Sequence, residues 1–493
     1  MKKLLIYILP FLVALSSCRD LEEINVNPNL PLETHPQFQL TKIQWDAFRE
    51  KAGTGPLYAT KMLVQTDGVN SGQYYQWDRG SFEDFGNLRD IQKMMEEAQQ
   101  LESNAYIALA KFFRSFYFYS LTLTFGDIPY AQALQGETDS NFTPVYNSQK
   151  EVFLGILKEL EEANTLLSEE AGSIAGDIIF DGDITQWQKT INAFRLKVLM
   201  SLSHKVGDSE FNIKSTFVQI VQNEPLFEST EDNAQLVFLD QEGNRYPEFN
   251  SSGYGSGMYM DSTFVKRLQI HQDPRLFIYC TQTKNAKEAG KAINDFTAYE
   301  GGDPAVPYSK VNDKALAGNV SKVNERYHKD PTNEPMVLIG YPEQQFILAE
   351  AVVRGWINGD ANAYYQSGVK GSFKFYEMHA EGYEQYVDEN AANHYLALTE
   401  NDLDQVATAE EKIELIILQR YFQTFQQSGW TAFFEHLRTG YPSFRRPDGV
   451  DIPFRWIYPQ SEYNYNTENV SIAIERQFGA GNDKINQEVW WLQ

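Results

Sequence analysis

The sequence predicts an all-α fold in which helical hairpins stack side by side and are joined to a large irregular part. Apolar residues recur three and four positions apart through much of residues 37–206, which is the period of an amphipathic helix. No stretch with the period of a β-strand competes over a comparable length. Between about residues 207 and 335 the helical pattern weakens, and Gly, Asn, Ser and Asp become frequent.

The first helices are expected at residues 38–51, 57–65, 88–101 and 105–125. The last of these is apolar on nearly every side, so we expect it to be a central helix surrounded by others. It should end at Gly126, because glycine readily takes the left-handed conformation of a helix cap and Pro129 prevents the helix from resuming.

A second helical pair is expected at residues 152–167 and 187–202, and helices return at 341–356, 361–379 and 410–425. No tandem repeat is visible at the level of identities, so the hairpins are inferred from helix pairing alone. We expect a single body over residues 37–493, with a helical scaffold at about 37–206 and 341–427. The irregular, ligand-bearing region would cover about 207–340 and 428–493, because long irregular stretches in a compact protein are usually functional.

The N-terminus has the features of a secretory leader that is followed by a lipid anchor. Two lysines precede a short apolar run, and Leu-Ser-Ser leads into Cys18, which is the order of a lipobox. We therefore predict a signal peptide at residues 1–17, lipidation of Cys18, and an extended, proline-containing tether at 18–36. Cys280 is then left without a partner and is expected to be buried as a small apolar residue.

Composition narrows the range of ligands. The formal net charge is -25, and no Lys/Arg cluster stands out against it, so nucleic acid is not an expected partner. Aromatic residues make up 14% of the chain, with 28 Tyr and 32 Phe, which is more than a helical core alone needs. Exposed aromatic faces suit sugar rings, although most of the tyrosines are expected to line helix seams.

The sequence lacks the common catalytic motifs. The seven His are scattered, no Gly-x-Ser-x-Gly elbow occurs, and the glycines at 253–257 lack the lysine and the strand–helix context of a phosphate loop. Glycoside hydrolysis needs only two suitably spaced carboxylates, which a chain with 67 Asp and Glu does not exclude. No cofactor is expected. Calcium stays open at the oxygen-rich turns 78–87 and 177–183, neither of which matches a helix–loop–helix calcium site.

Several landmarks in order along the chain resemble the SusD/RagB family, and specifically its SusD-like branch of outer-membrane lipoproteins from Bacteroidetes. They are the lipobox, NVNPN at 25–29, FGDIPY at 125–130, the stretch 187–197, YPE at 341–343, AEA at 349–351, RGW at 354–356, RTGYP at 438–442, RWIYP at 455–459 and WW at 490–491. Most read as scaffold positions; Arg354, for example, can pair with Glu350 one helical turn away.

The resemblance implies four tetratricopeptide-like helical hairpins plus an irregular half. It also implies a surface lipoprotein in the outer membrane, facing the cell exterior, that captures oligosaccharide and passes it to a SusC-type TonB-dependent transporter without catalysis. A peptide ligand, as in the RagB branch, is the alternative, and a secreted hydrolase is a third.

For the ligand platform we predict Tyr74, Tyr75 and Trp77, because aromatics this close together in a polar segment are unlikely all to face one core. Tyr254 and Tyr259 in the glycine-rich loop form a second set, with Asn250 as a polar partner. The competing interpretation is that Trp77 is a core residue beneath its loop.

Overall fold

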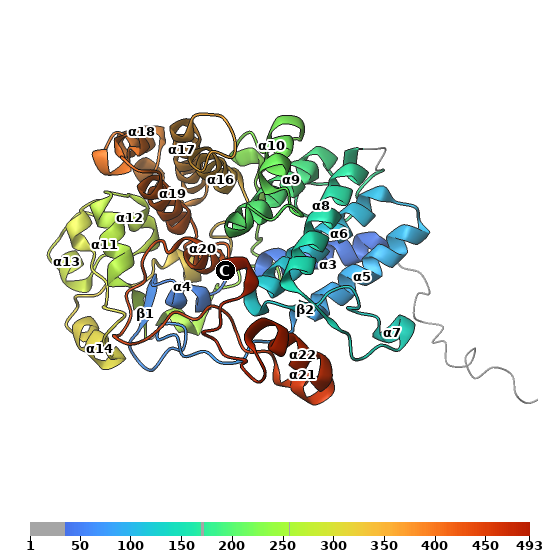
Figure 1. The fold of residues 1–493 in the computed structure, drawn as a ribbon. Helices are drawn as coiled ribbons and strands as arrows, with labels where there is room; N and C mark the ends of the chain where they lie inside the picture. Colours follow the sequence, from blue (N-terminus) through green and yellow to red (C-terminus); the bar gives the residue numbers. More distant parts are fainter. Residues whose placement is uncertain (1–34, 169–171, 256) are drawn as a thin grey trace, which may run out of the picture.

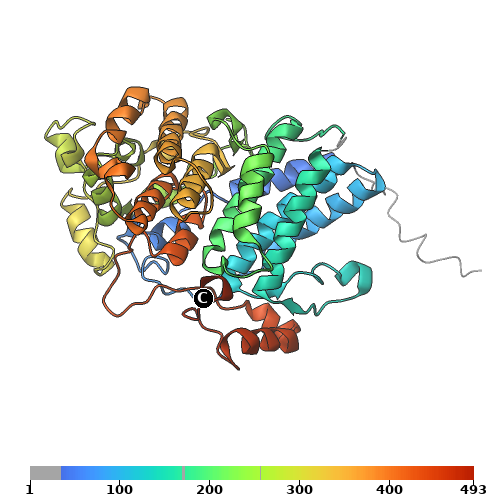
Figure 2. The same cartoon turned by 45° about the horizontal axis from the view of Figure 1, so that its top comes forward.

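The computed structural model describes residues 35–168, 172–255 and 257–493. The predicted leader, Cys18 and nearly all of the tether lie outside these residues. The all-α prediction is confirmed, because long helices make up two neighbouring groups and strands are few and short (Figures 1 and 2). The C-terminus lies between the two groups in both views. None of the described helices combines the length and the hydropathy needed to cross a bilayer.

The first group of helices contains the predicted hairpins of the N-terminal half. Helices α5 and α6 form one antiparallel pair and α8 and α9 form the next, while α3 packs across α5 and α6. Their bounds are α3 Pro36–Arg49, α5 Asp84–Gln100, α6 Asn104–Phe125, α8 Gln149–Ser168 and α9 Ile184–Ser201.

Helix α6 is the central element of this group, as its all-round apolar pattern predicts. Phe112 is fully buried and its ring contacts those of Phe113, Trp187 and Phe194 at centroid distances of 5.0–5.8 Å. The helix ends at Gly126, whose φ of +90° disfavours side chains. A Cβ there would lie 2.2 Å from a side-chain oxygen of the C-terminal helix α22, Thr467–Phe478, so glycine also allows that helix to approach.

The second group contains the helices predicted after residue 340. Helix α16 packs against α17 and α19, and it also contacts α9 of the first group. The bounds are α16 Tyr341–Val353, α17 Ala361–His379, α18 Glu389–Leu396, α19 Ala409–Gln423 and α20 Thr431–Thr439. Helix α17 begins at Asp360, whose carboxylate accepts the amide hydrogens of residues 362 and 363.

Within the part of the chain that the structure describes, the remaining segments carry short helices and three two-stranded antiparallel sheets, which pair β1 with β5, β2 with β3, and β4 with β6. The strands are β1 Leu63–Gln65, β2 Ile128–Pro129, β3 Tyr146–Asn147, β4 Ala234–Leu236, β5 Met258–Met260 and β6 Met336–Ile339. The short helices are α4 Gly55–Ala59, α7 Gly136–Asp139, α10 Ile213–Asn223, α11 Ser262–Ile270, α12 Arg275–Tyr279, α13 Lys284–Glu288, α14 Tyr308–Leu316, α15 Arg326–Lys329 and α21 Gln460–Tyr465.

The helix predicted at residues 57–65 is wrong in its second half. Helix α4 ends at Ala59, Lys61 takes a φ of +59°, and the chain then continues as strand β1. The left-handed residue ends the helix, and pairing with β5 nearly 200 residues later recruits the following apolar residues into a strand. Helical spacing in so short an apolar run cannot reveal a partner that distant.

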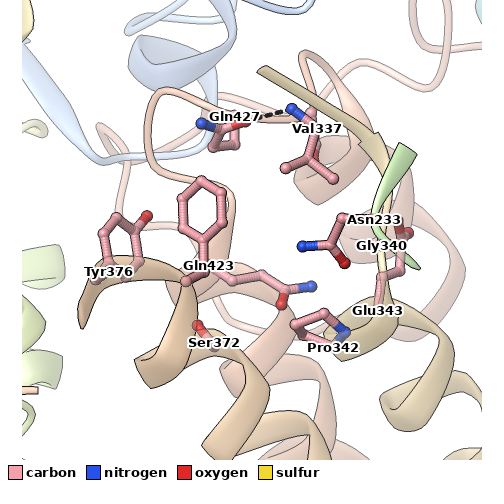
Figure 3. A pocket seen from close by; sticks show the side chains of 11 residues that line it. Asn233, Val337, Gly340, Pro342, Glu343, Ser372, Tyr376, Gln423 and Gln427 are labelled. Atoms are coloured by element: carbon pink, nitrogen blue, oxygen red, sulfur yellow. Dashed lines mark hydrogen bonds between the residues drawn. The ribbon is translucent and has the colours of Figure 1, made fainter. Parts of the chain in front are cut away.

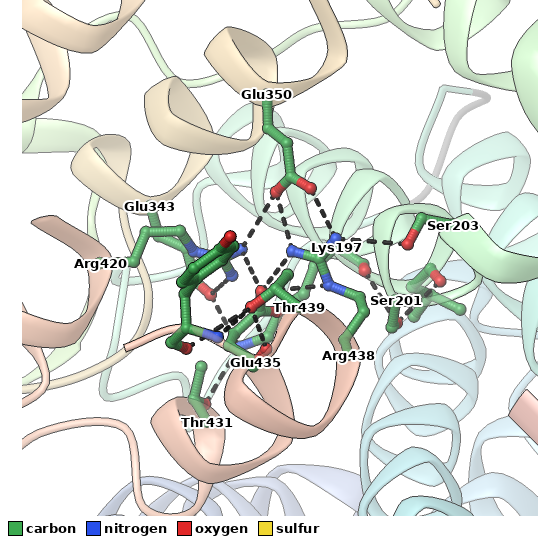
Figure 4. Close-up of polar contacts among 12 residues, drawn as sticks. Lys197, Ser201, Ser203, Glu343, Glu350, Arg420, Thr431, Glu435, Arg438 and Thr439 are labelled. Atoms are coloured by element: carbon green, nitrogen blue, oxygen red, sulfur yellow. Dashed lines mark hydrogen bonds and ion pairs between the residues drawn. The ribbon is translucent and has the colours of Figure 1, made fainter. Parts of the chain in front are cut away.

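A buried network of charges joins the two groups of helices (Figure 4). Arg438 of α20 donates to both carboxylate oxygens of Glu350 in α16 at 2.6 and 2.8 Å. The predicted pair between Glu350 and Arg354 is confirmed at 2.7 Å. The other members lie on α9, α16, α19 and α20, and they are Lys197, Glu343, Arg420 and Glu435.

Opposite charges compensate for burial in this network. The surrounding arginines hold the pKa of Glu350 down at about 2, and Lys197 with Arg420 also lowers the pKa of Glu343. Both carboxylates are therefore charged at neutral pH although they are buried. The motifs at 341–343, 349–351 and 438–442 thus carry scaffold contacts, as expected. Cys280, likewise as expected, is free and buried.

Candidate ligand-binding face

Three partly exposed tryptophans from distant segments form one cluster. The rings of Trp77 and Trp456 stack with centroids 4.8 Å apart and planes 9° from parallel. Trp430 stands edge-on to both, at 5.9 Å from Trp77 and 4.8 Å from Trp456. The buried ring of Phe433 lies 5.3 Å from Trp77. We call Trp77, Trp430 and Trp456 the tryptophan cluster; it offers large apolar faces that remain in part accessible to solvent.

The backbone around Trp77 is held against the C-terminal segment. The indole Nε1 of Trp77 donates to the carbonyl of Arg455 at 3.2 Å, and Arg79 pairs with Ile457 in a parallel bridge. Gly80 lies so close to the ring of Phe125 that a Cβ would come within 2.4 Å of it. Glycine therefore lets this segment pack directly onto the end of the central helix α6.

Trp430 is positioned by the charge network. It directly precedes helix α20, whose Glu435 and Arg438 belong to the network. The first residue of that helix, Thr431, accepts a long hydrogen bond of 3.4 Å from Lys197 of α9. The helical scaffold thus fixes the edge-on member of the tryptophan cluster.

The two tyrosines predicted alongside Trp77 are buried beneath the surface. Tyr74 is 8% exposed and its hydroxyl donates to the carbonyl of Val306 at 2.8 Å. Tyr75 is 4% exposed, donates to the carbonyl of Ala59 at 2.7 Å, and meets Trp77 edge-on at 5.7 Å. The structure therefore brings Tyr75 and Trp77 together but places the tyrosine in the supporting layer. Ligand contact by these residues stays a prediction.

The second predicted set lies elsewhere in the fold. Tyr254 is 4% exposed, its ring stacks on His328 at 5.1 Å, and its hydroxyl accepts a hydrogen bond from Gln426 at 2.7 Å. Tyr259 is partly buried in β5, and Asn250 is exposed with a φ of +59°. Within the described residues no ring contact links these tyrosines to the tryptophan cluster. Their role in binding also stays a prediction.

Two surface grooves of about 490 and 500 Å³ lie in the region that was expected to carry the ligand. Both include Thr263 and Arg267 of α11, so they are neighbours. Residues 443–451 line the second groove, and the same segment reaches Trp456 five residues later. Each groove falls within the volume range typical of small-molecule sites.

A smaller cavity between β6, α16, α17 and α19 is a packing feature (Figure 3). Its volume is about 50 Å³, enough for a water molecule or two and too small for a sugar ring. Polar side chains surround it, and Gln427 on its wall accepts the amide hydrogen of Val337 at 3.0 Å.

The oxygen-rich turn at 177–183 is held by hydrogen-bond donors. The carboxylate of Asp177 accepts from Gln44 and Trp187 side chains, both at 2.8 Å, and from the backbone of Gly182 at 2.9 Å. These donors occupy the carboxylate positions that a cation would need. Among the described residues no group of three or more His, Cys, Asp or Glu is arranged to hold a metal ion.

Asp261 and Lys61 are two fully buried charged residues in this part of the fold. Asp261 is fully buried and caps helix α11 by accepting the amide hydrogen of Thr263 at 2.6 Å. Lys61, also fully buried, donates to the carbonyl of Gln73, and its Nζ lies 3.8 Å from the ring centroid of Tyr75. Burial raises the pKa of Asp261 and lowers that of Lys61. The backbone amide of Asp261 donates to the carbonyl of Met62 at 2.9 Å, which joins the chain next to Lys61 to the start of the helix that lines both grooves.

The fold is a helical scaffold that carries a partly exposed cluster of tryptophans, and comparison with known proteins identifies its family. Residues 28–459 match the SusD-like family described as "starch-binding associating with outer membrane", and the chain belongs to this family. A crystal structure from Bacteroides vulgatus, described as an outer membrane protein probably involved in nutrient binding, is 53% identical with a TM-score of 0.91; the match covers 93% of this chain and 100% of that one.

Two SusD homologues from Bacteroides fragilis are also similar. One is 53% identical with a TM-score of 0.89, covering 94% of this chain and all of the homologue. The other is 34% identical with a TM-score of 0.86, covering 93% of this chain and all of the homologue. No curated protein matches the sequence.

Proposed function

We propose that this protein captures oligosaccharide at the cell surface and delivers it to a SusC-type TonB-dependent transporter, without catalysing a reaction. The observation that carries the proposal is the tryptophan cluster, whose Trp456 follows by five residues the segment 443–451 that lines a groove of ligand size. Family membership supports glycan capture, and a structure that shares the fold at 24% identity is described as a chitin-binding protein.

The test of capture is isothermal titration of residues 19–493 against panels of neutral oligosaccharides and peptides. We expect one glycan class to bind. Trp456→Ala should lower the affinity for that glycan by up to about tenfold, because one aromatic stacking contact contributes about 0.5–1.5 kcal/mol. Trp45→Ala is the matched control, since Trp45 is partly exposed on α3 and its ring contact is with Phe238, away from the cluster. Tyr259→Ala tests the second predicted set.

Unchanged affinity in Trp456→Ala and Trp430→Ala variants that remain folded would remove the cluster from the binding site. Binding of peptides alone would favour the RagB-like alternative. Turnover of a glycan by the purified protein would establish a hydrolase instead.

Attachment through Cys18 is part of the same proposal. The full chain expressed in a Bacteroides host should incorporate an alkyne-labelled fatty acid, and Cys18→Ser should abolish the labelling. Surface exposure predicts that protease added to intact cells degrades the protein. Co-purification of a TonB-dependent transporter with the tagged full chain would support delivery, and its absence from mild detergent extracts would count against it.

A further inference from the structure

The two grooves carry an excess of positive charge on a strongly acidic protein. Their walls hold five cationic and three anionic side chains, whereas the whole chain has a formal net charge of -25. The anionic members are Glu300, Asp448 and Asp451. The cationic members are Lys266, Arg267, Lys314, Arg445 and Arg446.

Three of these cations have no carboxylate partner. Within the described residues no ion pair of 4 Å or less involves Lys266, Arg267 or Arg446. Lys314 pairs with Glu300, and Arg445 makes a two-pronged contact with Asp303 at 2.7 Å for each bond. Lys314 and Arg445 are thus paired with carboxylates, whereas Lys266, Arg267 and Arg446 leave positive charge in the walls of the grooves.

The unpaired guanidinium groups are held in place by backbone carbonyls. Arg446 donates from Nε to the carbonyl of Val450 at 2.6 Å and from Nη1 to that of Phe444 at 3.2 Å. Arg267 donates from Nη2 to the carbonyl of Ser443. Carbonyl contacts orient a guanidinium without neutralising it, so each group keeps its full charge and some of its five N–H donors.

Arg267 is the cation that the two grooves share. Its guanidinium carbon lies 5.8 Å from the centroid of the Tyr421 ring, and its Nη2 donates to the carbonyl of Ser443. Arg267 lines both grooves, so an acceptor bound in either one lies near this guanidinium. Arg446 lines the second groove with it.

We propose that these grooves bind the oxyanion of an acidic oligosaccharide, a carboxylate or a sulfate ester carried on a sugar ring, through Arg267 and Arg446. The proposal rests on the glycan capture proposed above and narrows its ligand class. Guanidinium forks match the two-oxygen geometry of both anions. The tryptophan cluster, whose Trp456 follows the groove-lining segment 443–451 by five residues, offers faces for further sugar rings. Lys266, exposed at the rim, adds attraction that salt screens.

The experiment titrates residues 19–493 with matched pairs of oligosaccharides in 50 mM NaCl. Galacturonic acid oligomers are compared with neutral galactose oligomers, and sulfated galactose oligomers with the same neutral galactose oligomers, which separates the two sources of charge. We expect at least one acidic member to bind about tenfold or more tightly than its neutral counterpart, because hydrogen bonds between charged groups are among the strongest in proteins. Raising NaCl to 500 mM should remove much of this preference.

The variants locate the effect. Arg446→Gln should weaken the acidic oligosaccharide about tenfold and its neutral counterpart by a clearly smaller factor, so that the preference for the acidic member falls. Lys266→Gln, at an exposed position with no packing role, should weaken it by a smaller factor that depends on salt. The control is Arg89→Gln on α5, which removes an exposed arginine far along the chain from either groove and should change nothing.

Equal affinities for an acidic oligosaccharide and its neutral counterpart would overturn the proposal. So would an affinity for the acidic oligosaccharide that neither Arg446→Gln nor Lys266→Gln reduces. In that case, binding of a neutral oligosaccharide to the wild type but not to Trp456→Ala would still support the proposed glycan capture. Silence toward every oligosaccharide would refute both proposals. Binding of a glutamate hexapeptide with the same Arg446 dependence and no sugar binding would assign the grooves to acidic peptides instead.

Discussion

Replacing Glu350 by Gln tests whether the buried charge network holds the two groups of helices together. Glu350 is fully buried and accepts two hydrogen bonds from Arg438 and one from Arg354, and Arg420 lies 4.0 Å away. Glutamine has nearly the same volume but lacks the negative charge. The change therefore leaves the surrounding arginines buried without their central counter-charge.

The size of the effect follows from the pKa of Glu350, which lies at about 2 where an ordinary glutamate has 4.5. At about 1.4 kcal/mol per pH unit, the folded protein stabilises the charged form by roughly 3 kcal/mol. Removing one partner of a buried ion pair typically costs about 3–5 kcal/mol. We therefore expect Glu350→Gln to lower the free energy of unfolding by roughly 3 kcal/mol at pH 7.

The same pKa determines the pH dependence. Because the folded pKa lies below the unfolded one, this stabilisation is complete above pH 4.5 and is lost as the pH falls toward 2. The difference between wild type and Glu350→Gln should therefore be smaller at pH 3 than at pH 7.

The assay is urea unfolding followed by tryptophan fluorescence and, independently, by circular dichroism. Glu381→Gln is the control, because Glu381 is exposed after α17 and outside the network. A double change, Glu350→Leu with Arg438→Met, should be less damaging than Glu350→Gln, since it removes both opposed charges together. A Glu350→Gln midpoint equal to that of wild type would refute the reasoning.

Three further stability predictions use the same unfolding assay. Phe112→Ala should destabilise the protein by about 3–5 kcal/mol, because the ring is fully buried among aromatic neighbours of α6 and α9. Gly301→Ala should destabilise it strongly, because a Cβ would lie 2.3 Å from backbone atoms at the start of α11, whereas Gly68→Ala meets nothing within 4 Å. Burial lowers the pKa of His436 to about 4, so the stability that its neutral ring contributes is lost as the pH falls from 6.5 toward 4. His436→Gln should therefore lose less stability than wild type over that pH range. The control His394→Gln, at an exposed position, should lose as much as wild type.

Each of these predictions has an outcome that contradicts it. Phe112→Ala unfolding at the wild-type midpoint would mean that the centre of the first helical group tolerates a large void. Equal behaviour of the Gly301 and Gly68 variants would show that α11 can shift away without cost. A wild-type acid profile in His436→Gln would show that this ring is protonated in the folded protein as readily as in the unfolded chain.

The sequence predicts the long helices well because their signal is local. The expected helix at 361–379 coincides with α17, and that at 105–125 differs from α6 by one residue. In both, apolar spacing and a capping residue lie within the element itself. Strand β1 lacks such a local signal. It forms because it pairs with the distant strand β5 and because the left-handed residue Lys61 ends the helix before it.

The candidate site could be predicted only in part. The polar, aromatic-rich segment pointed to Trp77, which lies in the tryptophan cluster, and its ligand contact stays a prediction. Tyr75 beside it adopts a φ of +53° and turns into the supporting layer. Trp430 and Trp456 were missed as site residues, although Trp456 belongs to a family landmark. Their rings contact that of Trp77, which lies more than 350 residues earlier in the sequence, and no local sequence pattern predicts a contact over that separation.

The same dependence on distant contacts shows how the helical scaffold holds the segments that carry the tryptophan cluster. The tryptophan cluster draws on the loop after β1, the start of α20 and the C-terminal segment, and none of these holds its own position. Trp77 depends on the carbonyl of Arg455, and Trp430 depends on the charge network through α20. Flexible segments alone would pay the entropy of ordering at each binding event, and that cost would weaken capture of a sugar that offers few strong contacts. Under the proposed function, the helical hairpins and their buried charges order these segments in advance, so that weak stacking and a few directed hydrogen bonds suffice to hold the sugar.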